Sequence, residues 1–197
     1  MKKIEISIAA AFLICVISAL VQLPFAKTCE EVRTDTLRLH IIANSDKPED
    51  QEVKLAVRDA ILKQSEHLFS SAGSKAEAES NLEAKLGEIK RIARRTLSDN
   101  GFEYPVAVTV ADTYFNQREY DGFTLPAGTY TALRVELGGA KGKNWWCVLY
   151  PTLCVPCATD IEPLSEYSDE ERDLVKGTEK YKIKFKLEEW LQSLIND

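Results

Sequence analysis

The sequence predicts an α+β fold, in which a mostly antiparallel sheet packs against two long N-terminal helices and a short C-terminal helix follows. Two periodicities predict it. Apolar and polar residues alternate, as on strands with one buried face, in residues 36–43, 104–110, 130–137 and 145–150. Between the first two of these segments, apolar residues recur every three or four positions over two long stretches, as on helices.

The N-terminus has the pattern of an export signal. Lys2 and Lys3 precede an uncharged, mostly apolar run from Ile6 to Leu23. One interpretation is a cleaved signal peptide ending at Ala26, and the other is a retained anchor, since about 18 apolar residues can just cross a bilayer. We therefore expect a signal peptide or anchor at 1–26, a short linker at 27–35 and a single α+β domain at 36–197, delivered outside the cytoplasm.

The first strand, at 36–43, carries leucine and isoleucine on one face and the polar residues Arg38 and His40 on the other. Residues 44–50 break this strand and start a helix. Asp46 and Glu49 have the spacing of a capping box, and Pro48 lies in the first turn, where its missing N–H costs nothing. The apolar stripe of this helix is Val53, Val57, Ala60, Ile61 and Leu68.

Ser74 and Glu77 form the capping box of a second helix, which ends at Asn100 and Gly101. Its apolar stripe is Leu82, Leu86, Ile89, Ala93 and Leu97. A glycine-rich hairpin loop at 138–142 joins the strands predicted at 130–137 and 145–150. Turns are predicted at 112–128, and a loop or short helix at 160–178. A strand at 181–186 and a short helix at 187–195 end the chain.

The composition excludes some classes of protein. Hydrophobic residues make up 45% of the chain, enough for a core, and the net charge of −6 argues against nucleic-acid binding. A basic cluster at 85–95 is interleaved with Glu88, which indicates a solvated helix face. No cofactor is expected.

Catalytic and metal signatures are missing from the sequence. It has no nucleophile elbow, no zinc-protease motif and no phosphate-binding glycine loop. His67 has no metal-ligand neighbours at suitable spacing. His40 is compatible with a general base assisted by Ser45 or Asp46, but packing of His40 on the sheet is the favoured interpretation.

The chemistry expected of the cysteines depends on the compartment in which the protein acts. Without the first 26 residues the chain keeps Cys29, Cys147, Cys154 and Cys157, and outside the cytoplasm disulfides persist. Cys154 and Cys157 have redox-motif spacing, but no helix follows to activate a thiol, and no second pair completes a zinc site. A structural disulfide is favoured, first between Cys147 and Cys154, with bridges from Cys157 to Cys154 or Cys29 still open.

Several motifs resemble the stage II sporulation protein R family. They are Arg38-Leu39-His40-Ile41-Ile42-Ala43-Asn44-Ser45-Asp46, Glu49-Asp50-Gln51 with Lys54, Val57-Arg58-Asp59, Asn144-Trp145-Trp146-Cys147, Pro151 to Cys154, and Phe185-Lys186-Leu187-Glu188-Glu189-Trp190. The resemblance covers the chain from about Thr36 to Trp190, and Cys157 departs from it. It implies a non-enzymatic signal, secreted from the forespore into the space facing the mother cell.

The resemblance also implies a partner, a membrane-embedded aspartyl protease that cleaves the precursor of a mother-cell sigma factor. Membrane contact is expected through the N-terminal segment if it is not cleaved. Candidate partner-binding residues are Arg38, His40, Asn44, Ser45, Asp46, Arg58, Asp59, Trp145 and Trp146, where the two tryptophans point to opposite faces of their strand. The alternative function is an extracytoplasmic hydrolase acting on cell wall or peptide, with His40 as its base.

Overall fold

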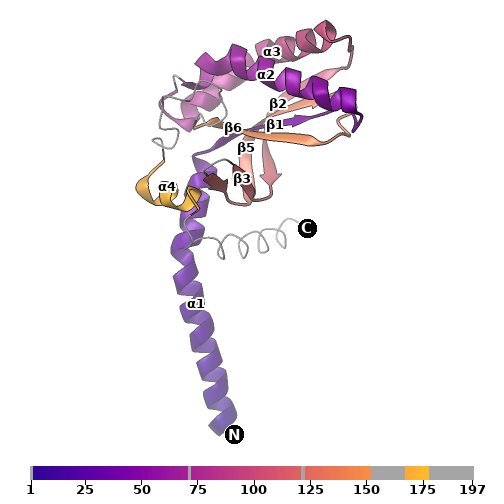
Figure 1. Ribbon diagram of the computed structural model, residues 1–197. Coiled ribbons are helices and arrows are strands. Elements are labelled where there is room, and N and C mark those ends of the chain that lie inside the picture. The colour runs from indigo at the N-terminus through magenta and orange to yellow at the C-terminus, as the bar shows by residue number, and fades with distance from the viewer. Residues whose placement is uncertain (1, 71, 121–122, 152–166, 178–197) are drawn as a thin grey trace. The chain divides into compact units, whose positions relative to one another are not determined.

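The structure is a computed structural model and describes residues 2–70, 72–120, 123–151 and 167–177. Its elements form two compact units, and the domain expected at 36–197 contributes to both. The first unit contains α1 (Lys2–Thr34), β3 (Arg118–Tyr120), β4 (Phe123–Leu125) and α4 (Asp169–Val175). The second contains β1 (Leu37–Ile42), α2 (Pro48–Ser70), α3 (Lys75–Asp99), β2 (Val106–Phe115), β5 (Gly128–Leu137) and β6 (Asn144–Tyr150) (Figure 1).

Helix α1 runs through both the expected export signal and the expected linker. Its apolar part has a mean hydropathy of 2.5 and is long enough to cross a membrane. The helix continues to Thr34 because ion pairs one turn apart, Lys27 with Glu31 and Glu30 with Arg33, support its last turns. The segment expected to be a linker is therefore helical over most of its length.

In the first unit, the side chain of Arg33 fixes the end of α1 to the chain after β4. Its Nη1 donates a hydrogen bond of 2.8 Å to the carbonyl oxygen of Ala127. A Cβ on Gly128 would lie 2.4 Å from Arg33 Cδ, so only glycine fits beside this arginine. The short strands β3 and β4 pair antiparallel, where the sequence predicts only turns.

In the second unit, the strand order is β2-β5-β1-β6. The central strand β1 is parallel to β5 and antiparallel to β6, so the sheet is mixed. The parallel pairing is possible because α2, α3 and further strands separate β1 from β5 in the chain, which is long enough for a crossover.

Helices α2 and α3 cover one face of this sheet, as predicted (Figure 1). The predicted stripe of α3 is buried except for the partly buried Leu86, and in α2 Val53, Val57 and Ile61 are buried. The Ser74 hydroxyl accepts a hydrogen bond from the Glu77 N–H, and Glu77 accepts one from the Gly73 N–H, which confirms this cap. Helix α4 lies within the segment predicted as loop or short helix. The predicted elements at 181–186 and 187–195 lie outside the described residues.

Candidate functional site

The buried carboxylate of Asp50, in the first turn of α2, is the centre of a hydrogen-bonded cluster that we call the Asp50 cluster. Its Oδ2 accepts hydrogen bonds from Asn44 Nδ2 at 3.0 Å and from Ser45 Oγ at 2.5 Å, and its Oδ1 accepts one from Tyr104 Oη at 2.7 Å. Asp50 is 1% exposed. Three segments are thereby joined, namely the turn after β1, the start of α2 and the residues before β2.

The same turn is bonded to the hairpin loop between β5 and β6. Asn44 Oδ1 accepts a hydrogen bond from the Gly139 N–H at 2.8 Å, and Asp46 Oδ1 accepts one from the Lys143 N–H at 2.7 Å. The predicted capping role of Asp46 is therefore replaced by a long-range contact, and α2 begins at Pro48. Asn44 and Ser45 shape the turn, as the structural interpretation of the sequence predicts.

Lys54, one turn further along α2, extends the contact between helix and loop. Its Nζ donates to Gln51 Oε1 at 2.7 Å and to the Lys143 carbonyl at 3.0 Å, while Gln51 Nε2 donates to the Ser45 carbonyl at 2.8 Å. Burial lowers the pKa of Lys54, and the nearby Asp46 carboxylate counteracts this. The loop is thus held by both backbone and side-chain groups of the turn and of α2.

Two glycines of the hairpin loop leave space for this contact. A Cβ on Gly138 would lie 2.2 Å from Asn44 Oδ1, and one on Gly142 would lie 2.2 Å from the Ser45 carbonyl oxygen. Gly138 also has a φ of 59°, which favours glycine. The glycine-rich loop predicted at 138–142 is therefore a closely fitted part of the cluster.

Hydrogen bonds to the carboxylate decide the direction of the pKa shift of Asp50. Burial alone raises the pKa of Asp50, but hydrogen bonds from Ser45, Tyr104 and Asn44 outweigh it, and the pKa lies below its usual value. Conversely, the bond to Asp50 raises the pKa of Tyr104. The carboxylate is thus kept ionised mainly by neutral hydrogen-bond donors, with a smaller contribution from the nearby charge of Lys47.

Arg38 and His40 lie on the sheet face opposite the helices, as the alternation predicts, but the expectation that they point outward is wrong. Arg38 is 0% and His40 is 5% exposed, because Phe115, Tyr130 and Trp146 cover this face. The guanidinium carbon of Arg38 lies 3.9 Å from the centre of the Phe115 ring, a cation–π contact.

His40 is stacked on Trp146, with ring centres 4.0 Å apart. Burial lowers the pKa of His40, and the positive charges of Arg134 and Arg38 lower it further. A hydrogen bond with the Asn144 side chain and the negative charge of Glu136 raise the pKa, but they do not outweigh burial. Ser45 and Asp46 are bonded elsewhere, so the proposed base and its partners are not brought together.

A second group of candidates, which we call the Arg58 surface, combines Arg58, Asp59 and Trp145. Arg58 pairs with Asp59, with 2.6 Å between Nη2 and Oδ1, and its guanidinium carbon lies 4.3 Å from the centre of the Trp145 ring. The Asp59 side chain is 63% exposed, whereas Trp145 packs partly against the core. Trp146 lies on the opposite face, as predicted, and is also partly buried, so neither tryptophan is a fully exposed anchor.

Sequence reasoning did not select Asp50, Tyr104 and Lys54 as site residues. A usable signal existed for Asp50, because it lies three and seven positions before Val53 and Val57 and so falls on the apolar stripe of its helix. A carboxylate on a buried stripe requires hydrogen-bond donors. No comparable signal points to Tyr104, which reaches Asp50 only through the tertiary fold.

The cysteine predictions are only partly covered by the described residues. Cys147 is buried in β6, and Cys29 is buried in α1. Cys154 and Cys157 lie outside the described residues, so the predicted pairing stays a prediction. Within the described ranges, no group of three or more His, Cys, Asp or Glu side chains is placed to hold a metal ion.

Comparison with known proteins identifies the family. Residues 33–160 match the family model for stage II sporulation protein R. The chain is 33% identical over 182 residues to stage II sporulation protein R of Bacillus subtilis strain 168, covering 81% of each chain. No solved structure matches the chain significantly. The matched residues include β1, the Asp50 cluster and β6, so the chain belongs to the stage II sporulation protein R family and its role lies in sporulation.

Proposed function

We propose that this protein is an exported signal of endospore formation that activates a membrane-embedded aspartyl protease, which then cleaves the precursor of a mother-cell sigma factor. It would act as a ligand and not as an enzyme, in the space between forespore and mother cell. The family match over residues 33–160 carries the proposal. Helix α1 supports it, because its length and hydropathy suit a signal peptide or a membrane anchor.

The Arg58 surface is the strongest candidate for contact with the protease. It combines an arginine, an exposed carboxylate and a partly buried tryptophan, and arginine and tryptophan are enriched among residues that dominate interface energies. Asp46 is also exposed and remains a candidate. Arg38, His40, Asn44 and Ser45 would instead act indirectly, because they maintain the fold beside these surfaces.

Co-expression in a non-sporulating host tests activation. The full chain, the protease and the sigma-factor precursor are produced together, and conversion of the precursor is followed on immunoblots. We expect conversion only when all three are present. Conversion that does not depend on this chain would rule out the activator role.

Charge reversal then tests the Arg58 surface in the same assay. We expect Arg58→Glu and Asp59→Lys each to reduce conversion at least about tenfold, as loss of an interface hot spot does. Lys63→Glu and Glu52→Lys are matched controls, because both residues are exposed on the same helix. Equal loss in the controls would show that this surface is not the contact.

The alternative function, an extracytoplasmic hydrolase with His40 as base, has less support. A general base must reach the proton that it removes, whereas His40 is 5% exposed and stacked on Trp146. His40→Ala separates the two functions. Full conversion of the precursor with this variant would exclude hydrolysis that depends on His40.

Within this function we propose a structural disulfide between Cys147 and Cys154. Export places the cysteines where disulfides persist, and Cys147 lies in the middle of β6, directly after its two tryptophans. Mass spectrometry of the non-reduced exported protein should detect a peptide pair joining the two residues. Detection of both as free thiols would refute the pairing, and a pair containing Cys157 would replace it.

A further inference from the structure

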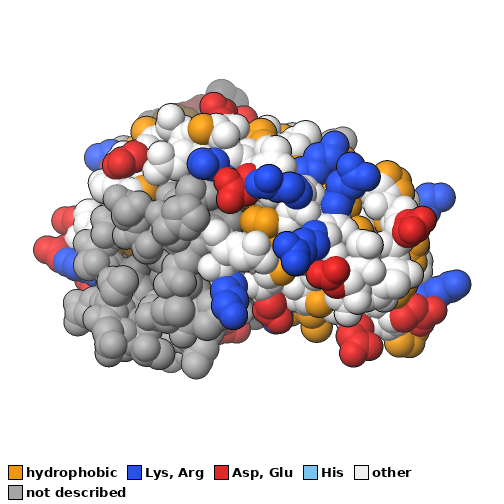
Figure 2. Space-filling view, turned by 90° about the horizontal axis from the view of Figure 1, so that it is seen from above, with side chains coloured by type: hydrophobic (Ala, Val, Ile, Leu, Met, Phe, Trp, Pro, Cys, Tyr) orange, Lys and Arg blue, Asp and Glu red, His pale blue; other side chains and the backbone are white. Residues whose placement is uncertain are grey.

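Helix α3 carries a group of exposed basic residues, Lys90, Arg91, Arg94 and Arg95, which we call the basic face. Figure 2 views the side of the molecule on which α2 and α3 lie and shows Lys and Arg side chains gathered there. The opposite side of α3 is buried through Leu82, Ile89, Ala93 and Leu97. Core packing therefore fixes the direction in which the basic face points.

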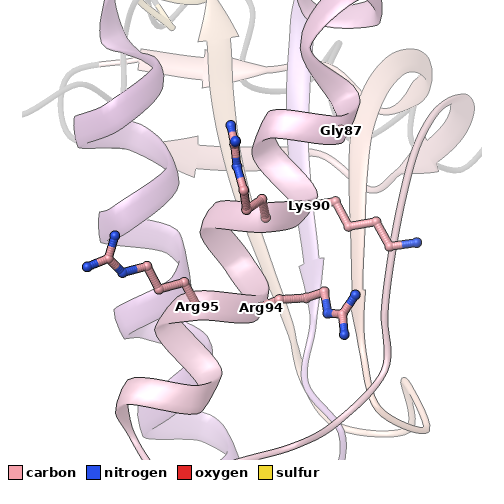
Figure 3. Close-up of a pocket in the computed structure, with 5 residues that line it drawn as sticks. Gly87, Lys90, Arg94 and Arg95 are labelled. Carbon is pink, nitrogen blue, oxygen red and sulfur yellow. The ribbon is translucent and has the colours of Figure 1, made fainter.

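The four residues of the basic face and Gly87 line an open, shallow depression of about 410 Å³ on the surface of α3. Lys90 and Arg94 extend on the same side of the helix, one and two turns beyond Gly87 (Figure 3). A Cβ on Gly87 would meet nothing within 4 Å, so packing does not require glycine there. Glycine inside an exposed helix lowers stability relative to alanine, and here it leaves bare backbone one turn before the cationic side chains.

The positive charge of this face is only partly neutralised. Arg95 lies 3.7 Å from Asp99 at the C-terminal end of the face, and before the face Lys85 pairs with Glu88 at 3.3 Å. Within the described part of the chain, Lys90, Arg91 and Arg94 form no ion pair. They stand three and four positions apart, where like charges repel and destabilise a helix. In a chain with a net charge of −6, such a group is not a consequence of overall composition.

We propose that the basic face of α3 binds the anionic headgroups of a phospholipid bilayer. Guanidinium and ammonium groups are the preferred protein ligands of phosphate, and clusters of Lys and Arg bind acidic membranes. No exposed apolar residue lies among the four basic residues, so we expect the basic face to contact the headgroups without inserting into the hydrocarbon core. A bilayer is the favoured partner because α1 brings the chain to a membrane, whether as a signal or as an anchor. The proposal is independent of protease activation.

Vesicle capture tests this proposal without any protease. The full chain is reconstituted through α1 into nanodiscs of neutral phosphatidylcholine and immobilised, and fluorescent vesicles are added. We expect vesicles with about one third phosphatidylglycerol to bind at least about tenfold more than vesicles of phosphatidylcholine alone, and about 1 M salt to abolish the difference. The triple variant Lys90→Glu, Arg91→Glu, Arg94→Glu should bind no more than background.

A matched triple variant controls for net charge. Lys63→Glu, Lys141→Glu and Lys176→Glu change the charge equally at exposed lysines of other elements and should keep capture within about twofold. Equal capture of neutral vesicles, or equal loss in both triples, would overturn the proposal. So would capture of a polyglutamate peptide by the basic face without capture of anionic vesicles, which would indicate an acidic protein segment. If the glutamate triple loses its helical circular dichroism, the corresponding glutamine triple takes its place.

Discussion

The hydroxyl of Tyr104 donates a hydrogen bond of 2.7 Å to Oδ1 of Asp50, across 54 positions of sequence. This bond joins the residues before β2 to the first turn of α2, while Asn44 and Ser45 occupy the other carboxylate oxygen. The motif that identifies the family at this end of β1 therefore encodes a structural junction. Its polar residues hold the fold beside any partner-binding surface.

Loss of the Asp50 carboxylate should destabilise the protein strongly. Asp50→Ala leaves the donors of Asn44, Ser45 and Tyr104 without their acceptor, and hydrogen bonds to a charged group contribute about 1.5–3 kcal/mol each before relaxation. We expect the free energy of unfolding to fall by about 2 kcal/mol or more, measured by urea denaturation with tryptophan fluorescence. The control is Asp59→Ala, exposed on the same helix, which should change stability by about 0.5 kcal/mol or less. Similar losses in both would show that the cluster does not stabilise the fold.

The loss of folding stability at acidic pH should also depend on Asp50. Its pKa lies below the ordinary 3.8, so as the pH falls through 3.8 the unfolded chain takes up a proton before the folded state does. The stabilisation is complete above this pH and is lost as the pH falls through the folded pKa. The stability difference between wild type and Asp50→Asn should therefore shrink on acidification from pH 6 to about pH 3. A constant difference over this range would contradict the role of the ionised carboxylate.

The lowered pKa of His40 should make the free energy of unfolding depend on pH near neutrality as well. Burial lowers its pKa from 6.5, so below pH 6.5 the unfolded chain binds a proton that the folded state excludes. Stability should be constant above this pH and fall below it, by at most about 1.4 kcal/mol per pH unit for one proton. His40→Phe, which keeps an aromatic ring beside Trp146, should flatten the profile. Both proteins would carry His67→Gln to remove the other titrating histidine, and an unchanged slope in the His40 variant would refute the prediction.

The hairpin loop offers a test of the contact with Asn44. Gly138→Ala introduces a Cβ 2.2 Å from Asn44 Oδ1 at a φ of 59°, so we expect a loss of about 1–3 kcal/mol in the free energy of unfolding. Gly139→Ala is the matched control, because its Cβ would lie at an ordinary 3.5 Å from the same atom. Equal effects of the two substitutions in thermal unfolding would show that the loop does not pack closely on Asn44.

The helices and main strands could be predicted from the sequence because each buries one face, and a single buried face leaves a periodic pattern. The stripe of α3 from Leu82 to Leu97 and its cap at Ser74 are local features of this kind. Strands β3 and β4 have three residues each, too few for a pattern to appear.

The environment of β1 could not be predicted in the same way. Alternation from Leu37 to Ile41 is the pattern of a half-exposed strand, yet both faces are buried. The second face is covered by Phe115, Tyr130 and Trp146, which are distant in sequence and meet Arg38 or His40 only through strand order. A buried arginine among aromatic rings therefore has the same local sequence pattern as an exposed one.

Two glycines with open surroundings should respond to alanine in opposite directions. A Cβ on either Gly87 or Gly101 would meet nothing within 4 Å, but Gly101 has a φ of 82° whereas Gly87 lies inside α3. Gly87→Ala should raise the free energy of unfolding by about 0.5–1 kcal/mol, because alanine loses less backbone entropy in a helix. Gly101→Ala should lower it by about 1 kcal/mol, because alanine is strained at positive φ. Thermal unfolding of the two variants measures both signs, and a destabilising Gly87→Ala would refute the expectation that backbone entropy decides the effect at this position.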